Sequence, residues 1–276
     1  MKHLQYIICI AIVSLMASCT KELDIDYDTI EPFYVIQGQI TDEPAKVLLT
    51  QSRDMNDSVK GKGLSDAQMI LSDDTGKTET LTFGADGYYH SPSGWTGETG
   101  RTYTLKAIIK GKEYSASSTM RPAVSLDSIK FVWASSAGMD MLLLKYVGTY
   151  PKTTELSQTY FLVTKNGRFY RSHADKQINP NNSISQALVG CTTKKVMEED
   201  DPEKQDVILH EGDKVHCELW SIDQNIYDYF KSVKTSQQNA SNPLSNFTKG
   251  VTGYFSAHHC QSMDITFSKS IITTMQ

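Results

Sequence analysis

From residue 32 onward, short runs of β-branched and aromatic residues alternate with polar turns, a pattern that favours β-strands. Runs recur about every ten residues, and turns such as Thr41–Pro44 and Asp73–Gly76 separate them. Gly111 stands between two runs and predicts a hairpin, because glycine adopts a positive φ without strain. The predicted strands are 33–40, 45–50, 67–72, 77–83, 103–109 and 113–117. This spacing predicts an immunoglobulin-like β-sandwich over residues 32–122.

Arg121–Ala123 breaks the pattern, and we place a domain boundary there. Residues 123–276 predict a second β-rich domain, in which Asn166-Gly167 marks a further hairpin. The chain turns polar over residues 171–206, which predicts a long excursion outside the sheets. The predicted strands are 128–133, 141–147, 160–164, 168–170, 215–220, 251–255 and 263–267.

One amphipathic helix is predicted near residues 222–238. Ser221 and Gln224 have the spacing of a capping box, and apolar residues follow with a period of 3.6. Ile226 and Phe230 share this apolar face and are expected to be buried. The fold class is therefore mainly β, with a sandwich followed by a β-rich domain that carries one helix. No repeat of fixed period is visible, which argues against a solenoid or propeller.

The first residues form an apolar run, Leu4–Met16, behind one lysine. The run is too short for a membrane span, and its flanks are typical of a signal peptide, here residues 1–18. Ala17-Ser18-Cys19 resembles a bacterial lipobox, which implies that Cys19 carries lipid and begins the mature chain. The alternative is an ordinary secretory signal with a cysteine near its cleavage site.

Residues 19–31 are acidic and poor in core residues, and they predict a solvated tether. Acidity just after a lipidated cysteine resembles the export signal of Bacteroidetes lipoproteins, which implies an outer-membrane protein facing the cell exterior. A plain spacer in the periplasm is the alternative.

Composition bears on two further questions, whether the chain binds nucleic acid and how its cysteines pair. With 27 basic and 32 acidic residues the chain has a net charge of −5, so nothing favours binding to nucleic acid. Beyond Cys19, the cysteines are Cys191, Cys217 and Cys260, and three thiols cannot all pair within one chain. One disulfide with a free thiol, or three buried free thiols, are both compatible with the sequence.

Several segments taken in order resemble domain of unknown function 4249, a family of Bacteroidetes lipoproteins. They are the lipobox and tether, Tyr34–Gly38, Asp86–Tyr89, Gly100–Leu105, Asn242-Pro243 and Gly253–Phe255. The resemblance covers nearly the whole mature chain. It implies an outer-membrane lipoprotein, often encoded beside TonB-dependent transporters, with an immunoglobulin-like or transthyretin-like first domain. It implies no known activity and supplies no catalytic residues.

No recognised catalytic motif is present in the sequence, so no enzyme activity and no cofactor are predicted. His258-His259-Cys260 offers metal-binding side chains, but neighbours on a strand point to opposite faces, and two ligands are too few for a site. No metal site is therefore predicted. The acidic run 198–203 lacks the spacing of a calcium loop and is interpreted as a solvated loop.

Four aromatic residues are candidates for stacking on a sugar ring: Trp95, Trp133, Tyr88 and Tyr89. The alternative is that they belong to the cores of the β-domains.

These observations predict a lipid-anchored outer-membrane protein that acts as a binding or scaffolding accessory of a TonB-dependent uptake system. Two alternatives are a surface adhesin unrelated to transport and a hydrolase with a site in the second domain. The ligand, the partner, the membrane face, the thiol pairing and the oligomeric state are not specified by the residues.

The lipobox interpretation makes a direct prediction. Replacing Cys19 with alanine is expected to abolish lipid attachment, because no other cysteine stands at the signal junction. Metabolic labelling with a radioactive fatty acid measures this. Label retained by Cys19→Ala at the level of the unmodified chain would contradict the lipobox.

Overall fold

The computed structural model describes residues 32–52, 63–136, 138–152, 156–177, 184–200, 202–239, 241–248 and 250–274. The signal peptide, Cys19 and the acidic tether lie outside the described residues. Pro32–Gln276 forms one compact unit, and the description below concerns this unit alone.

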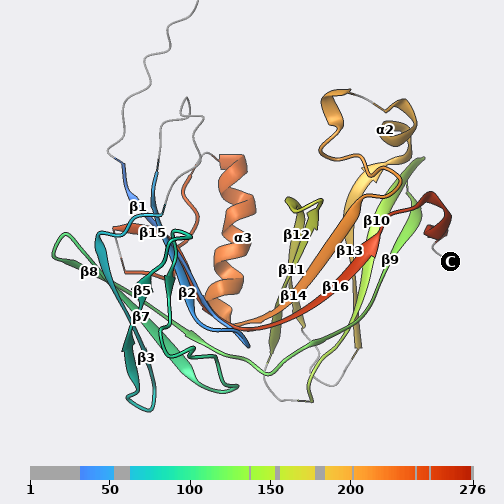
Figure 1. Cartoon of the computed structure of the whole chain (residues 1–276). Coiled ribbons are helices and arrows are strands. Elements are labelled where there is room, and N and C mark those ends of the chain that lie inside the picture. Colours follow the sequence, from blue (N-terminus) through green and yellow to red (C-terminus); the bar gives the residue numbers. More distant parts are fainter. Residues whose placement is uncertain are drawn as a thin grey trace, which may run out of the picture. The chain divides into compact units, whose positions relative to one another are not determined.

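The chain is mainly β, as the hydrophobic pattern predicts (Figure 1). Its strands are β1 (Tyr34–Ile40), β2 (Lys46–Gln51), β3 (Ala67–Asp73), β4 (Thr78–Thr80), β5 (Thr82–Phe83), β6 (Tyr89–His90), β7 (Thr102–Ile109), β8 (Lys112–Thr119), β9 (Ser125–Ser136), β10 (Met139–Thr149), β11 (Ser157–Lys165), β12 (Arg168–Gln177), β13 (Ile184–Thr193), β14 (Lys214–Ile222), β15 (Val251–Ala257), β16 (His259–Thr266) and β17 (Thr273–Thr274). The helices are α2 (Lys194–Glu199) and α3 (Gln224–Asn239), with 3-10 turns η1 (Pro202–Lys204) and η2 (Lys269–Ile271). Within the described residues, no helix is both long enough and apolar enough to cross a membrane.

Two sheets enclose the first core. Their strand orders are β15-β1-β2-β6-β5 and β4-β3-β7-β8. Alternate residues of β1, β2, β3 and β7 are buried between them, including Ile36, Leu49, Leu71 and Leu105. The predicted hairpin joins β7 to β8, and both Lys110 and Gly111 take a positive φ there. This arrangement is the β-sandwich expected from the period-two pattern.

Strand β15 comes from near the C-terminus yet pairs in parallel with β1. The register places Gly253 beside Ile36, where a β-carbon on residue 253 would lie 1.9 Å from the Ile36 carbonyl oxygen. Gly253 also has a φ of +108°, so both space and backbone conformation require glycine. The first sheet is therefore completed by residues beyond the proposed boundary at residue 122, and that boundary stays a prediction.

The second pair of sheets has the strand orders β13-β10-β9-β17 and β12-β11-β14-β16. Phe131, Leu144, Phe161 and Leu219 are among the side chains buried between them. Arg171 on β12 donates hydrogen bonds to the carbonyl oxygens of two β13 residues, Gly190 (3.0 Å) and Cys191 (2.8 Å), and so joins the neighbouring edges. The Asn166-Gly167 hairpin lies between β11 and β12, as predicted.

The prediction of one long excursion over residues 171–206 is wrong in part. Residues 171–177 continue β12, and residues 184–193 form β13. Both strands lie at a sheet edge and expose many of their side chains, so their polar composition hides the period-two pattern. The excursion itself is short and contains α2 and η1.

Helix α3 begins and ends close to the predicted positions, but its cap differs from the capping-box prediction. Ser221 belongs to β14, where its hydroxyl oxygen accepts a hydrogen bond from the Val124 amide. The N-cap is Asp223, whose carboxylate accepts from the Ile226 amide at 3.0 Å. As predicted, Ile226 is fully buried; Phe230 is half-buried and stacks on Tyr160 at 3.6 Å between ring centroids.

The Asp223 carboxylate also ties the helix to the first pair of sheets. Its second oxygen accepts from the Ser118 hydroxyl and the Thr119 amide of β8, both at 2.8 Å. The Ser118 oxygen in turn accepts from the Ala257 amide of β15 at 2.9 Å. Asp223 is 7% exposed, so these donors replace the water that the carboxylate would otherwise need.

We expect Asp223→Ala to destabilise the protein by about 2 to 4 kcal/mol, because it removes a helix cap and leaves three donors unpaired, two of them buried. Chemical denaturation measures the change. Asp228→Ala on the exposed face of the same helix is the matched control and is expected to stay within about 0.5 kcal/mol. Equal effects of the two substitutions would refute the role assigned to Asp223.

Candidate functional site

A cavity of about 200 Å³ lies at the end of the second pair of sheets that carries α2. Its lining comes from three separate segments: β9, α2 and the residues around η2. The lining residues are Trp133, Lys194, Met197, Glu198, Lys269 and Ile272. The cavity combines an indole ring, two apolar side chains, two ammonium groups and one carboxylate. Such a combination suits a small ligand that has both an apolar face and polar edges.

Helix α2 is held in place at both ends. The Thr193 hydroxyl oxygen accepts from the Val196 amide at 3.3 Å and caps the N-terminus, while Asp200 takes a left-handed conformation at the C-terminus. Lys194 also lies 4.0 Å from Asp140 of β10. This helix was not predicted from the sequence, and Lys194, Met197 and Glu198 were therefore not identified as lining residues; Glu198 was assigned to a solvated loop. The sequence signal that could have found it is Thr193 directly before a helix-forming stretch.

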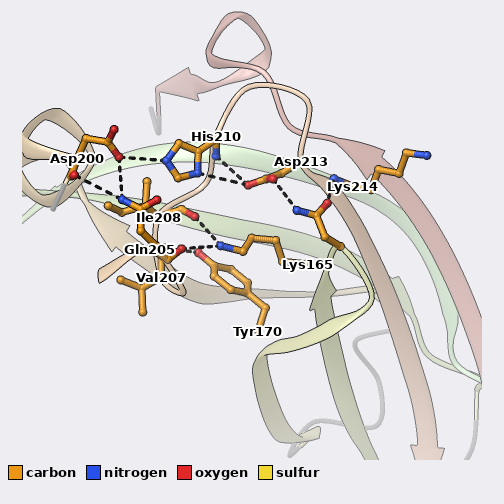
Figure 2. A network of polar contacts seen from close by, with 10 residues as sticks. Lys165, Tyr170, Asp200, Gln205, Val207, Ile208, His210, Asp213 and Lys214 are labelled. Atoms are coloured by element: carbon orange, nitrogen blue, oxygen red, sulfur yellow. Dashed lines mark hydrogen bonds and ion pairs between the residues drawn. The ribbon is translucent and has the colours of Figure 1, made fainter. Parts of the chain in front are cut away.

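The chain that follows α2 is fastened to the β11–β12 hairpin (Figure 2). The Lys165 ammonium donates to the carbonyl oxygens of Gln205 and Ile208, both at 2.8 Å, and the Tyr170 hydroxyl donates to the carbonyl oxygen of Val207 at 2.9 Å. Main-chain carbonyls that would otherwise need water are thereby paired. These hydrogen bonds fix the main chain of residues 205–208, although this segment forms no helix or strand.

A second part of the network joins the carboxylates of Asp200 and Asp213 to His210 and to the side-chain amide of Asn166 (Figure 2). His210 lies 3.1 Å from Asp200, and its amide donates to Asp213 at 2.8 Å. Asp213 also accepts from the Asn166 side chain at 2.7 Å. Hydrogen bonds from Gln205 and His210 hold the pKa of Asp200 below its usual range. Asp200 in the acidic run thus has partners within the chain.

The four candidate stacking residues do not lie at one site in the structure. Trp95 is 6% exposed and Tyr89 is 2% exposed, and both belong to the first core, where Trp95 makes a T-shaped contact with Tyr103 and Tyr89 makes one with Phe83. Tyr88 is half-buried near His90. Trp133 alone among the four lines the cavity. Because its indole is only partly buried, Trp133 keeps the surface that stacking requires.

His258, His259 and Cys260 point to different partners. The His258 ring stacks on Trp220 at 4.2 Å, while His259 lies 2.7 Å from Asp42 and Cys260 contacts Glu218. In the part of the chain that the structure describes, no cluster of three histidine, cysteine or acidic side chains is placed to hold a metal ion.

A further polar group lies on the outer face of β14 and β16. His216 contacts Asp264 at 2.8 Å and Glu218 at 3.3 Å. Burial favours the neutral ring, but hydrogen bonds and charges from the two carboxylates outweigh this and raise the pKa of His216.

The three described cysteines are free, and Cys191 and Cys217 are buried. Burial raises the pKa of Cys191 to about 11 and that of Cys217 to about 12. For Cys260, burial and the neighbouring Glu218 raise the pKa to about 12. The thiols therefore stay protonated at neutral pH, where a protonated thiol is a poor nucleophile.

The fold and the cavity together define a mainly β protein with a small, chemically mixed pocket at one end of its second pair of sheets. The chain belongs to the family described as domain of unknown function 4249, whose model matches residues 20–263. This confirms the family resemblance noted in the sequence. No curated protein matches the chain.

Two solved structures show distant similarity to the chain. A segment of two fibronectin type-III domains from chicken tenascin has 10% identity and a TM-score of 0.22, over 70% of this chain and 92% of that chain. A tetra-tandem repeat from the extending region of a large adhesion protein has 11% identity and a TM-score of 0.19, over 85% of this chain and 49% of that chain.

The buried His258 gives a prediction about pH. Burial lowers its pKa from 6.5 to about 3, so the folded protein keeps the ring neutral while the unfolded chain takes up a proton below pH 6.5. Its contribution to stability is therefore complete above pH 6.5 and is lost as the pH falls toward 3, by up to about 1.4 kcal/mol per pH unit.

Denaturation at pH 7.0, 5.5 and 4.5 measures this contribution. His258→Phe keeps a ring on Trp220 but cannot titrate, so its stability is expected to fall less steeply with pH than that of the unmodified chain. Other titrating groups act in both proteins and cancel in the comparison. Parallel curves for the two proteins would rule out His258 as a source of the pH dependence.

Proposed function

We propose that this protein is a lipid-anchored lipoprotein of the outer membrane that binds a small ligand as an accessory of a TonB-dependent uptake system. The cavity at Trp133 is the observation that carries the binding role, because it offers a concave surface with both apolar and hydrogen-bonding groups. Membership of the family supports the link to transport. The resemblance implies that such proteins are often encoded beside TonB-dependent transporters.

The proposed anchor is the lipid on Cys19. Each buried methylene contributes about 0.8 kcal/mol, and one acyl chain alone binds a membrane only marginally, so two or more chains make attachment stable. The acidic tether of residues 19–31 then separates the lipid from the compact unit that begins at Pro32. We propose that this tether also directs the protein to the exterior of the outer membrane.

Partnership with a transporter can be tested by affinity purification. The lipidated chain, carrying a C-terminal tag, is expected to enrich a TonB-dependent transporter from detergent-solubilised outer membranes. Tagged Cys19→Ala is the matched control for membrane location, and an unrelated tagged lipoprotein of the same membrane controls for nonspecific capture. Enrichment no greater than that of the unrelated lipoprotein would contradict the proposed partnership.

The orientation is tested through the tether. Replacing Glu22, Asp24 and Asp26 with alanine is expected to leave the protein in the outer membrane but to protect it from protease added to whole cells, because the export signal is lost. Replacement of Lys106, Lys110 and Lys112 in the first pair of sheets is the control and leaves protease sensitivity unchanged. Equal sensitivity of the tether variant and the unmodified chain would remove the tether from the export mechanism.

A further inference from the structure

The cavity at Trp133 is small for a ligand site. Its volume is about 200 Å³. Pockets for drug-sized molecules span about 300 to 1,000 Å³. The cavity therefore has room for one ring with its substituents.

The apolar part of the lining is suited to a flat face. Trp133 contributes an indole that is half-buried and anchored from behind, since the side chain packs against the second core. Met197 and Ile272 pack against the same core and lie beside it in the lining. A rigid aromatic face of this kind pairs with the C–H face of a saturated ring and loses little conformational freedom on binding.

The charged part of the lining offers hydrogen bonds without a strong net field. Lys194 lies 4.0 Å from Asp140, outside the lining. Lys269 lies close enough to Asp200 and Glu211 to lower the pKa of both carboxyls. With Glu198 in the lining as well, each ammonium group has acidic neighbours, so the cavity does not select an anion by charge.

We infer that this cavity binds a neutral pyranose ring, either a monosaccharide or one unit of an oligosaccharide. Such a ring has an apolar C–H face for Trp133, and each hydroxyl both donates and accepts hydrogen bonds. The Lys194 and Lys269 ammonium groups supply donors, and the Glu198 carboxylate supplies an acceptor. A purely apolar ligand would make no use of these three polar groups, and an anion would meet the surrounding carboxylates.

This inference rests on the proposed ligand-binding role and names the class of ligand. The test uses the full mature chain in detergent and a panel of glucose, galactose, mannose, xylose and N-acetylglucosamine, with glucuronate and galacturonate as anionic comparators. Calorimetric titration is expected to show saturable binding of at least one neutral sugar with a Kd of about 1 mM or tighter. The Kd is expected to be unchanged between 50 and 500 mM NaCl, because no net charge is neutralised.

Three variants locate the binding site. Trp133→Ala is expected to weaken binding by about tenfold, since it removes the stacking face and the polar contacts depend on that face to place the ring. Glu198→Gln changes an exposed side chain, keeps the fold and is expected to weaken binding about three- to tenfold. Lys195→Ala is the matched control, because Lys195 lies on the same helix, is 80% exposed and pairs with Glu199 outside the cavity.

The outcomes separate the alternatives. Binding of a neutral sugar that Glu198→Gln weakens and Lys195→Ala preserves supports the inference, even if Trp133→Ala proves too unstable to measure. Binding of the uronates alone, with affinity falling as salt rises, overturns it in favour of an anion site. No binding of any neutral sugar also overturns it. Enrichment of a transporter by affinity purification does not require this cavity. Failure of the sugar titration therefore leaves the proposed partnership with a transporter intact, and failure of the enrichment leaves the sugar site intact.

Discussion

The structure depends on the carboxylate of Asp223, which is buried at the point where β14 ends and α3 begins. A charge without water must receive hydrogen bonds from the protein, and Asp223 receives them from its own helix and from β8. The same group thus sets the start of α3 and fixes the position of β8 beside it. Helix α3 can then lie over Tyr160 and Trp220 and shield an aromatic sheet face that would otherwise be exposed to solvent.

Periodicity predicted most of the strands because each buries one face, so alternation of polar and apolar residues is preserved in β1, β7 and β10. The later part of β12, residues 171–177, and the whole of β13 were predicted to be an excursion; both strands lie at sheet edges and carry polar residues on their exposed positions. The cap of α3 was misassigned to Ser221 because a capping-box spacing is local, whereas the choice of Asp223 depends on donors from β8 that are distant in sequence.

The candidate site was predictable only through Trp133. Aromatic residues in a β-protein serve either as core or as ligand surface, and composition does not distinguish Trp95, which is buried, from Trp133, which is not. The polar lining comes from α2 and η2, which the fold brings together although they lie far apart in the chain. Charged residues such as Lys194 and Lys269 resemble any other surface lysine until this arrangement is known.

The parallel pairing of β15 with β1 has a consequence for biogenesis. During synthesis the N-terminal end emerges first, so β1 leaves the ribosome long before its partner. The first sandwich then keeps an open edge until almost the entire polypeptide has been made, and closing it requires contacts between remote segments, which form slowly. Until the last strands arrive, the unpaired backbone groups of β1 can pair with another chain, so this edge is where aggregation of the incomplete protein would begin.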